Sequence, residues 1–397
     1  MHREAPAPPG PRVRYPAYMG SSPAPIIFWA VVATRFILPL GIPIFPLPAI
    51  IGCLLVDAFD QPIFQTFTHV DLSQYQAYDK ALDIFYLSIA MLTMYRNWKS
   101  RPAVEIGRVL FYLRLVGVLA FESTGWRWLL FLLPNAFEYY FIFYEAIRSR
   151  WTPTRLSAHF YLVSAAAIWI LKLPQEYWIH IAKLDVTDEV KHVVLHMPKN
   201  APWLSSIAHS PISFGLMLAA LATFIIVGRM AIHRFAGPAQ HAPRLAADPL
   251  PEHIDDAPER TREIAKTWHL FDIHLAEKLV LVSFITVIFA RIVPGVHASP
   301  PQLLGGAALI VTLNAFLRLR RSRMARLLNS GVLSFLLLAT TNAGIVAVAD
   351  ALLRTRGGGL DVGTTMFFML LLTLVVTLYD RFRPIYEFRF APRRKAA

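Results

Sequence analysis

The chain has 397 residues and a net charge of +13, from 39 lysines and arginines against 26 aspartates and glutamates. Hydrophobic residues make up 55%, charged residues only 16%, and the mean hydropathy is +0.46. Soluble domains carry about 25% charged residues, so this composition excludes an ordinary soluble domain and a disordered chain. The single cysteine excludes a disulfide framework. Arginine exceeds lysine and alanine is abundant, which indicates a bacterial source.

The N-terminal residues 1–25 are rich in proline and are predicted to be a disordered tail, without the short apolar core of a cleavable signal peptide. The apolar region 26–59 follows, and four prolines between Pro39 and Pro48 interrupt it. Because proline breaks a continuous helix, this region predicts either one net membrane crossing or two short spans.

Nine further apolar stretches follow, several of them close to the roughly 20 residues that span a bilayer. They lie near 83–95, 108–122, 128–147, 158–182, 211–232, 275–293, 303–319, 331–349 and 363–380. The predicted fold is therefore an all-α, polytopic integral membrane protein of ten or eleven transmembrane helices. The polar connection 236–270 is predicted to be a linker. It joins an N-terminal membrane bundle, residues 26–235, to C-terminal membrane helices with a basic tail, residues 271–397.

The positive charge alternates along the chain. One set of connections holds 24 lysines and arginines, and the alternate set holds 8. The basic set comprises 96–108, 148–155, 229–266, 318–326 and 381–397. Cytoplasmic loops carry the excess of basic residues, so we expect this set and the C-terminus in the cytoplasm and the loop 57–83 outside. Arg3, Arg12 and Arg14 favour a cytoplasmic N-terminus, hence ten crossings. The charge thus predicts a multi-pass inner (plasma) membrane protein and no nucleic-acid partner.

The densest acidic segment places Asp57 and Asp60 at the predicted end of one span, and Asp79 and Asp83 at the start of the next. Four carboxylates at two facing helix ends suit one or two divalent cations, Mg²⁺ or Mn²⁺, and such cations can hold a phosphate or diphosphate. The alternative is a pair of solvated helix ends, with Asp79 favoured there by capping and the helix dipole.

Asp-x-x-Asp followed by Asp-x-x-x-Asp on the next helix resembles the CDP-alcohol phosphotransferases, over about residues 31–83. Thr34-Arg35 with Pro39 in the preceding span is also similar. The resemblance implies that Asp57, Asp60, Asp79 and Asp83 bind divalent metal, and that one of them is the general base for an acceptor alcohol.

Some positions differ from that family. Gln61, the pair Phe64-Gln65 and Tyr75 stand where it has residues that serve the nucleotide. A CDP-linked donor is cytoplasmic, whereas the loop 57–83 is predicted to lie outside. Polyprenyl-phosphate-linked donors present their phosphate on that side, so they fit the predicted topology.

Charged residues at membrane depth are functional candidates because their burial in lipid is costly. Lys172, Glu176 and His180 are spaced i, i+4, i+8, which places them on one helix face beside Pro174. They form either a functional site or a structural group in which Lys172 and Glu176 neutralise each other.

Other charges are expected to be structural. Arg114 is expected to join two helices by pairing with Glu138 or Glu145, because buried charges normally pair. In the second half of the chain, Glu277, Lys278 and Asp350 are expected to be interfacial.

A third cluster lies in the predicted outer loop 183–210. Asp188, His192 and His196 would share one face of a helix and could ligate zinc. The alternative is an interfacial amphipathic helix. No haem, flavin or nucleotide motif is present.

The favoured function is a metal-dependent membrane transferase that acts on a lipid- or polyprenyl-linked phosphate. One aspartate would serve as base, and Lys172 would offset phosphate charge. The expected partners are membrane lipid and the lipid-linked substrate. The alternatives are an ion- or proton-coupled transporter that uses the same charges, and a non-catalytic membrane assembly protein.

Overall fold

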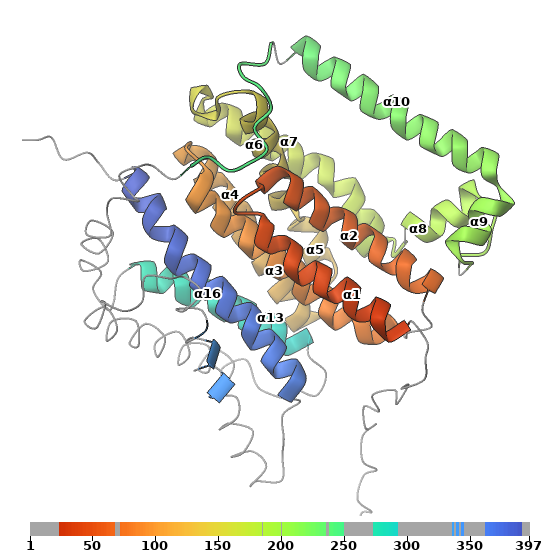
Figure 1. Cartoon of the computed structure of the whole chain (residues 1–397), viewed down its shortest axis with the longest axis horizontal. Coiled ribbons are helices and arrows are strands. Elements are labelled where there is room, and N and C mark those ends of the chain that lie inside the picture. The colour runs from red at the N-terminus through yellow and green to blue at the C-terminus, as the bar shows by residue number, and fades with distance from the viewer. Residues whose placement is uncertain are drawn as a thin grey trace, which may run out of the picture.

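The computed structural model describes residues 24–67, 72–184, 186–199, 201–235, 238–249, 273–292 and 362–390, with residues 336, 339, 340, 343 and 344. Throughout these ranges every regular element is a helix, which confirms the all-α class (Figure 1).

The centre of the bundle is α3 (Leu72–Asn97). Nearly every side chain between Ala81 and Tyr95 is buried, because helices cover it on several sides. α4 (Arg101–Thr124), α13 (Ile273–Ile292) and α16 (Val362–Phe390) all pack on it. α13 and α16 lie side by side along it, so the two halves of the chain share one core (Figure 1).

The proline-rich first region forms a hairpin of two helices, as one of the two predicted alternatives requires. α1 (Ala24–Ile37) runs into the 3₁₀ turn η1 (Leu38–Gly41), and the chain then reverses into α2 (Pro46–Phe67). Pro39 of η1 and Pro46 and Pro48 of α2 stand in first turns, where a missing N–H breaks no helical hydrogen bond, whereas Pro62 lies inside α2. Three of the prolines thus coincide with the starts of η1 and α2.

α5 and α6 divide the stretch 128–147, for which the sequence predicted one span. α5 (Trp128–Leu132) ends before Pro134, and α6 (Ala136–Arg150) begins after it. Proline has no N–H to continue the helical ladder, which explains the break. α7 (Ala158–Glu176) packs on α4 and α6, and it ends in a π-helix, η3 (Tyr177–Ile181).

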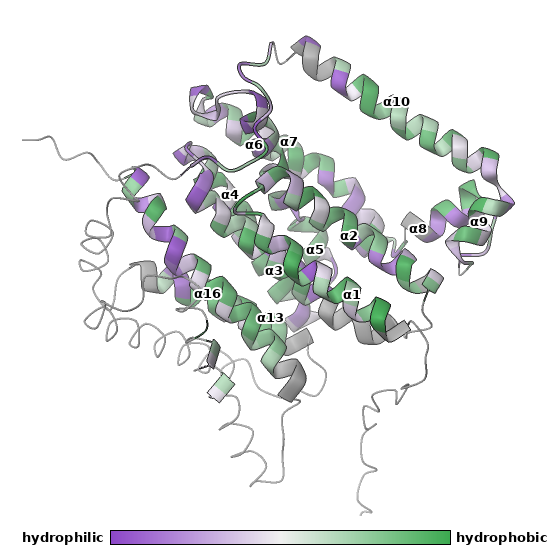
Figure 2. Cartoon of the chain, in the orientation of Figure 1, coloured by the Kyte–Doolittle hydropathy of each residue, from purple (hydrophilic) through white to green (hydrophobic). Residues whose placement is uncertain are grey.

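The chain then leaves the bundle. Three short helical pieces lead outward: α8 (Val186–Glu189), η4 (Val190–Val194) and α9 (Trp203–His209). α10 (Pro211–Phe235) follows and stands apart from the other helices (Figure 1). Figure 2 shows apolar residues along most of its length, and Ile212 and Phe224 are 78% and 77% exposed. A helix that is apolar all round is typical of burial in a membrane or a large core.

Two helices in the described ranges are long and apolar enough to cross a membrane, Pro46–Phe64 and Pro211–Met230. They include the predicted span 211–232 and the second half of the first hairpin. The predicted spans near 303–319 and 331–349 fall outside the described ranges, apart from a few isolated residues.

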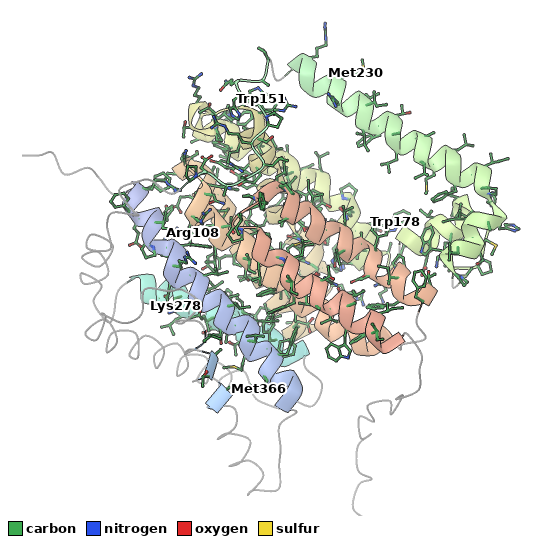
Figure 3. All side chains as sticks on the ribbon, in the orientation of Figure 1. Arg108, Trp151, Trp178, Met230, Lys278 and Met366 are labelled. Carbon is green, nitrogen blue, oxygen red and sulfur yellow. The ribbon has the colours of Figure 1, made fainter. Side chains whose placement is uncertain are left out.

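Four of the five predicted basic connections meet at one end of the bundle, which we call the basic end. Arg389 of α16 donates to the carbonyl oxygens of Arg96 and Trp98, after α3. Asp248 of the linker pairs with Lys99 at 2.7 Å and with Arg148 at 3.4 Å. The connection 318–326 lies outside the described residues. Polar residues gather at this end in Figure 2, and Arg108 and Trp151 mark it in Figure 3.

The turn between α1 and α2 also lies at the basic end, since the linker residue Ala247 donates its N–H to the carbonyl oxygen of Ile44. α1 therefore starts at the opposite end. α1 and α2 thus run in opposite directions, and the number of crossings, ten or eleven, stays a prediction.

Candidate metal centre

The four predicted aspartates lie inside helices and not at helix ends, so that part of the sequence expectation is wrong. α2 continues from Asp57 and Asp60 to Phe67, and α3 begins at Leu72, about two turns before Asp79. A capping role for Asp79 does not fit this position, because caps and dipole effects act within the first turn.

All four aspartates converge on Arg35 of α1. The Arg35 Nη2 lies 2.5 Å from Asp57 Oδ1, and its Nη1 lies 2.5 Å from Asp60 Oδ2. The same guanidinium also contacts Asp79 and Asp83. Spacings of three residues on α2 and four on α3 place each pair of carboxylates on one helix face. We call these five residues the aspartate cluster.

Among the ion pairs between described residues, the aspartate cluster sets four carboxylates against one guanidinium. The Arg35 side chain is only 3% exposed. Lys80, the next cation along α3, is turned to Glu122 at 3.0 Å. Carboxylates this close together repel one another, so a bound cation would stabilise the group, three of whose members are 29–39% exposed.

A divalent cation fits the available ligands. Oxygens of Asp57, Asp79 and Asp83 all lie within 4.8 Å of one another, so these three residues could hold a metal ion. Hard divalent cations prefer carboxylate oxygens. Asp60 is the most deeply buried of the four, and its Oδ1 accepts the Gln61 backbone N–H at 2.5 Å.

A second polar network adjoins the aspartate cluster. Glu138 of α6 accepts hydrogen bonds from the Tyr86 hydroxyl of α3 and from Asn135 Nδ2 at 3.0 Å. The Asn135 backbone N–H donates to Glu176 at 3.2 Å, which extends the network to α7. Tyr86 follows Asp83 by three residues on α3, so the network begins one helical turn from the aspartate cluster.

The predicted stripe on α7 forms contacts among its own members. Lys172 Nζ and His180 Nε2 lie 3.5 Å and 3.0 Å from the Glu176 carboxylate. Lys172 also donates to Gln175 at 3.0 Å, and its ammonium lies 4.4 Å from the centre of the Tyr139 ring. The stripe is therefore a largely paired group, set beside Glu138 rather than on the aspartates.

The predicted pairing of Arg114 is not formed. Glu145 pairs with Arg148 at 2.5 Å and accepts the Trp98 indole N–H at 2.8 Å, near the basic end. Arg148 lies one turn away on the same helix, so it competes successfully with a residue on α4. Within the described ranges Arg114 has no ion pair, and its Nη1 is buried without a hydrogen-bond partner.

The predicted zinc ligands do not share a helix face. The helix ends before His196, whose φ of +52° places it in the left-handed region. Asp188 pairs with the buried Lys191 at 3.0 Å. Within the described ranges, only the three aspartates form a group that could hold a metal ion.

Sequence reasoning missed a second charged group, near the basic end. Glu277 of α13 accepts hydrogen bonds from Tyr95 at 2.5 Å and Tyr379 at 3.2 Å. Arg383 and Arg108 lie 3.2 Å and 3.7 Å from it. Lys278, predicted to be interfacial, is buried and pairs with Asp380 at 2.9 Å. Asp350 lies outside the described residues.

Because the charged residues of this group lie on three helices, α4, α13 and α16, their sequence positions are far apart. The Glu277 cluster, as we call it, comprises Glu105, Glu277, Asp380 and Glu387 with Arg108, Lys278 and Arg383. Arg35 was likewise visible in the sequence as a charge within a span, but nothing in the spacing showed that it is the partner of all four aspartates.

Comparison of the chain with protein-family models, with curated proteins and with solved structures found no match.

Proposed function

We propose that the protein is a metal-dependent membrane transferase that acts on a lipid- or polyprenyl-linked phosphate. The observation that carries this proposal is the convergence of four carboxylates from α2 and α3 on a single guanidinium from α1. A partly exposed site with this many carboxylates is suited to hold divalent cations together with an anionic substrate.

Asp57, Asp79 and Asp83 would hold Mg²⁺ or Mn²⁺. The bound cation would neutralise phosphate charge. An aspartate of the cluster would accept the proton of the acceptor hydroxyl while that oxygen bonds to phosphorus and the bond to the leaving group breaks. Arg35 would supply a fixed positive charge beside the transferred group.

The second polar network has a supporting part in this proposal. Lys172 lies on α7 beyond Glu138. Its positive charge would offset the negative charge of the incoming phosphate. The contact between Glu176 and His180 at 3.0 Å would hold the imidazole in place beside the network.

The membrane placement draws support from two observations. The first is the meeting of the four described basic connections at one end, as the positive-inside rule requires. The second is the exposure of α10, whose candidate span has no buried residue. An apolar helix so exposed would be a liability in water but suits contact with lipid.

Metal binding tests the proposal directly. We expect Mn²⁺ to bind the detergent-purified protein, as followed by electron paramagnetic resonance of free Mn²⁺, and to bind Asp79→Asn at least tenfold more weakly. Asp248→Asn is the matched control, since it removes a carboxylate of the linker. Equal Mn²⁺ binding by the wild type and Asp79→Asn would overturn the proposed site.

A transport assay separates the main alternative. Counterflow in proteoliposomes that is driven by a proton or sodium gradient would favour a transporter. Metal-dependent turnover of a lipid phosphate, without such counterflow, supports the transferase.

The side of the membrane can be tested at position 71. The single cysteine, Cys53, is buried, so Asp71→Cys introduces one reactive thiol. We expect a membrane-impermeant maleimide to label it from outside in intact cells. Labelling from the cytoplasmic side alone would reverse the topology and favour a CDP-linked donor.

A further inference from the structure

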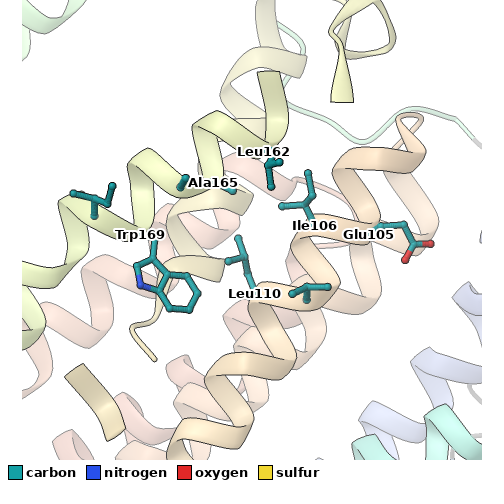
Figure 4. Close-up of a pocket in the computed structure, with 9 residues that line it drawn as sticks. Glu105, Ile106, Leu110, Leu162, Ala165 and Trp169 are labelled. Carbon is teal, nitrogen blue, oxygen red and sulfur yellow. The ribbon is translucent and has the colours of Figure 1, made fainter. Parts of the chain in front are cut away.

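An apolar groove of about 500 Å³ runs between α4 and α7. Ile106 and Leu110 of α4 face Leu162, Ala165 and Trp169 of α7 across it (Figure 4). Glu105 lies at its rim, but the Glu105 carboxylate points away from the groove and is bonded by Tyr386 and Arg108. The groove therefore offers almost entirely hydrocarbon surface.

The groove is open at its side. Val109, Leu162 and Ile170 line it and are each more than half exposed. Its size is within the roughly 300–1,000 Å³ range of small-molecule sites. A lining of this kind, at membrane depth, suits a flexible hydrocarbon chain that enters from the side.

Two cations stand one turn beyond the groove, away from the basic end. On α4, Arg114 follows Leu110 by four residues, and on α7, Lys172 follows Trp169 by three. Residues at these spacings share one helix face, so both cations continue the stripes that line the groove. Both also act electrostatically on Glu138 and Glu176, which places them in the same polar region.

Arg114 has capacity for a ligand. Its Nη1 is buried without a hydrogen-bond partner, and it has no ion pair in the described part of the chain. A buried donor left unsatisfied is costly, and an anionic oxygen would satisfy it. Lys172 is already paired with Glu176 at 3.5 Å, so it would contribute charge more than a new contact.

We infer that this groove binds a lipid phosphate, with one hydrocarbon chain between α4 and α7 and the phosphate headgroup at Arg114 and Lys172. The inference rests on the membrane placement in the proposed function. It assigns the lipid substrate a binding site on the polar network that adjoins the aspartate cluster. Lipid binding here does not require the metal site, so the two can fail separately.

The test uses phosphatidic acid as the probe and phosphatidylcholine as the zwitterionic comparison. Lipid retained by the full-length protein in detergent is measured by native mass spectrometry. We expect phosphatidic acid to be retained at least fivefold more than phosphatidylcholine, and Arg114→Gln to remove that preference. Arg155→Gln changes an exposed arginine elsewhere and is expected to keep it.

A second pair of variants tests the groove without removing charge. Ala166 is exposed and lines the groove, whereas Ala167 is exposed beside it and does not. We expect Ala166→Trp to fill the groove and lower retention of phosphatidic acid at least fivefold, and Ala167→Trp to leave it unchanged. Both substitutions add the same bulk at exposed positions, so a folding defect would affect them alike.

Asp79→Asn separates this inference from the proposed function. Retention of phosphatidic acid by Asp79→Asn at the wild-type level, with Mn²⁺ binding lost, supports both. Equal retention by Ala166→Trp and Ala167→Trp, or no preference for phosphatidic acid in the wild type, would overturn the lipid site and leave the metal site standing.

Discussion

The aspartate cluster and the Glu277 cluster each hold four carboxylates within the same bundle, but they are neutralised very differently. In the aspartate cluster, Arg35 is the cation that contacts all four carboxylates. In the Glu277 cluster, three cations face four carboxylates, and tyrosine hydroxyls satisfy more of the oxygens. Buried ion pairs need such compensation to be tolerated. The comparison indicates that the Glu277 cluster joins helices, whereas the aspartate cluster has charge left over for a ligand.

The largest expected effect is on activity, at Asp79. Asp79→Asn should reduce metal-dependent turnover by about 10²-fold or more, because it removes a metal ligand or the base. The same variant should unfold no earlier than the wild type without metal, since it relieves repulsion among carboxylates. Turnover and thermal unfolding with EDTA measure the two effects. A large loss of stability in metal-free Asp79→Asn would show that the aspartate cluster is structural, as the Glu277 cluster is.

The opposite result is expected at Glu277. Glu277→Gln removes the carboxylate that Arg108 and Arg383 share and leaves them Glu105 and Glu387 as partners among the described residues. It should destabilise the fold by about 3 kcal/mol, the lower end of the cost of breaking a buried pair. Chemical denaturation in detergent measures this. The Mn²⁺ affinity of the folded fraction should stay at the wild-type value. A loss of Mn²⁺ binding there would show that this cluster is more than structural.

An intermediate effect is expected at Arg35. Arg35→Gln leaves four carboxylates with no contacting guanidinium, so the metal-free protein should be less stable than the wild type. Saturating Mn²⁺ should then stabilise the variant by about 1–3 kcal/mol more than it stabilises the wild type. Thermal unfolding across a Mn²⁺ titration measures the difference. Glu122→Gln is a useful control, because it removes the partner of Lys80 outside the cluster.

The smallest effect is expected at the basic end. Burial raises the pKa of Asp248, but the hydrogen bond from Lys99 and the charges of Lys99, Arg148 and Arg244 outweigh burial and lower it below its ordinary value of 3.8. The stabilisation is therefore fully present above pH 3.8 and is lost as the pH falls through the lower folded-state pKa.

Asp248→Asn should free the linker segment 238–249 at neutral pH at a cost of at most about 1 kcal/mol, because the pair is partly exposed. Hydrogen exchange of that segment measures it. The wild type should reach the same exchange rate only in strong acid. Unchanged exchange in the variant would show that backbone contacts, such as Gln240 to Arg150, hold the linker alone.

The sequence by itself determined the helical class, most helix positions and the set of basic connections that meet at one end. Helix faces follow from the 3.6-residue period. The spacing was therefore enough to place Asp57 and Asp60 on one helix face, and Asp79 and Asp83 on one face of the next helix. The chain also contains few polar residues outside its connections, which left little freedom in where its helices could run.

Only the tertiary structure decided which faces meet. The rotation of one helix against another depends on many apolar contacts along their length, and no single spacing records it. That rotation brought Arg35 into the aspartate cluster and left Arg114 beside the groove. It also assembled the Glu277 cluster from α4, α13 and α16, whose residues are up to 282 positions apart along the chain.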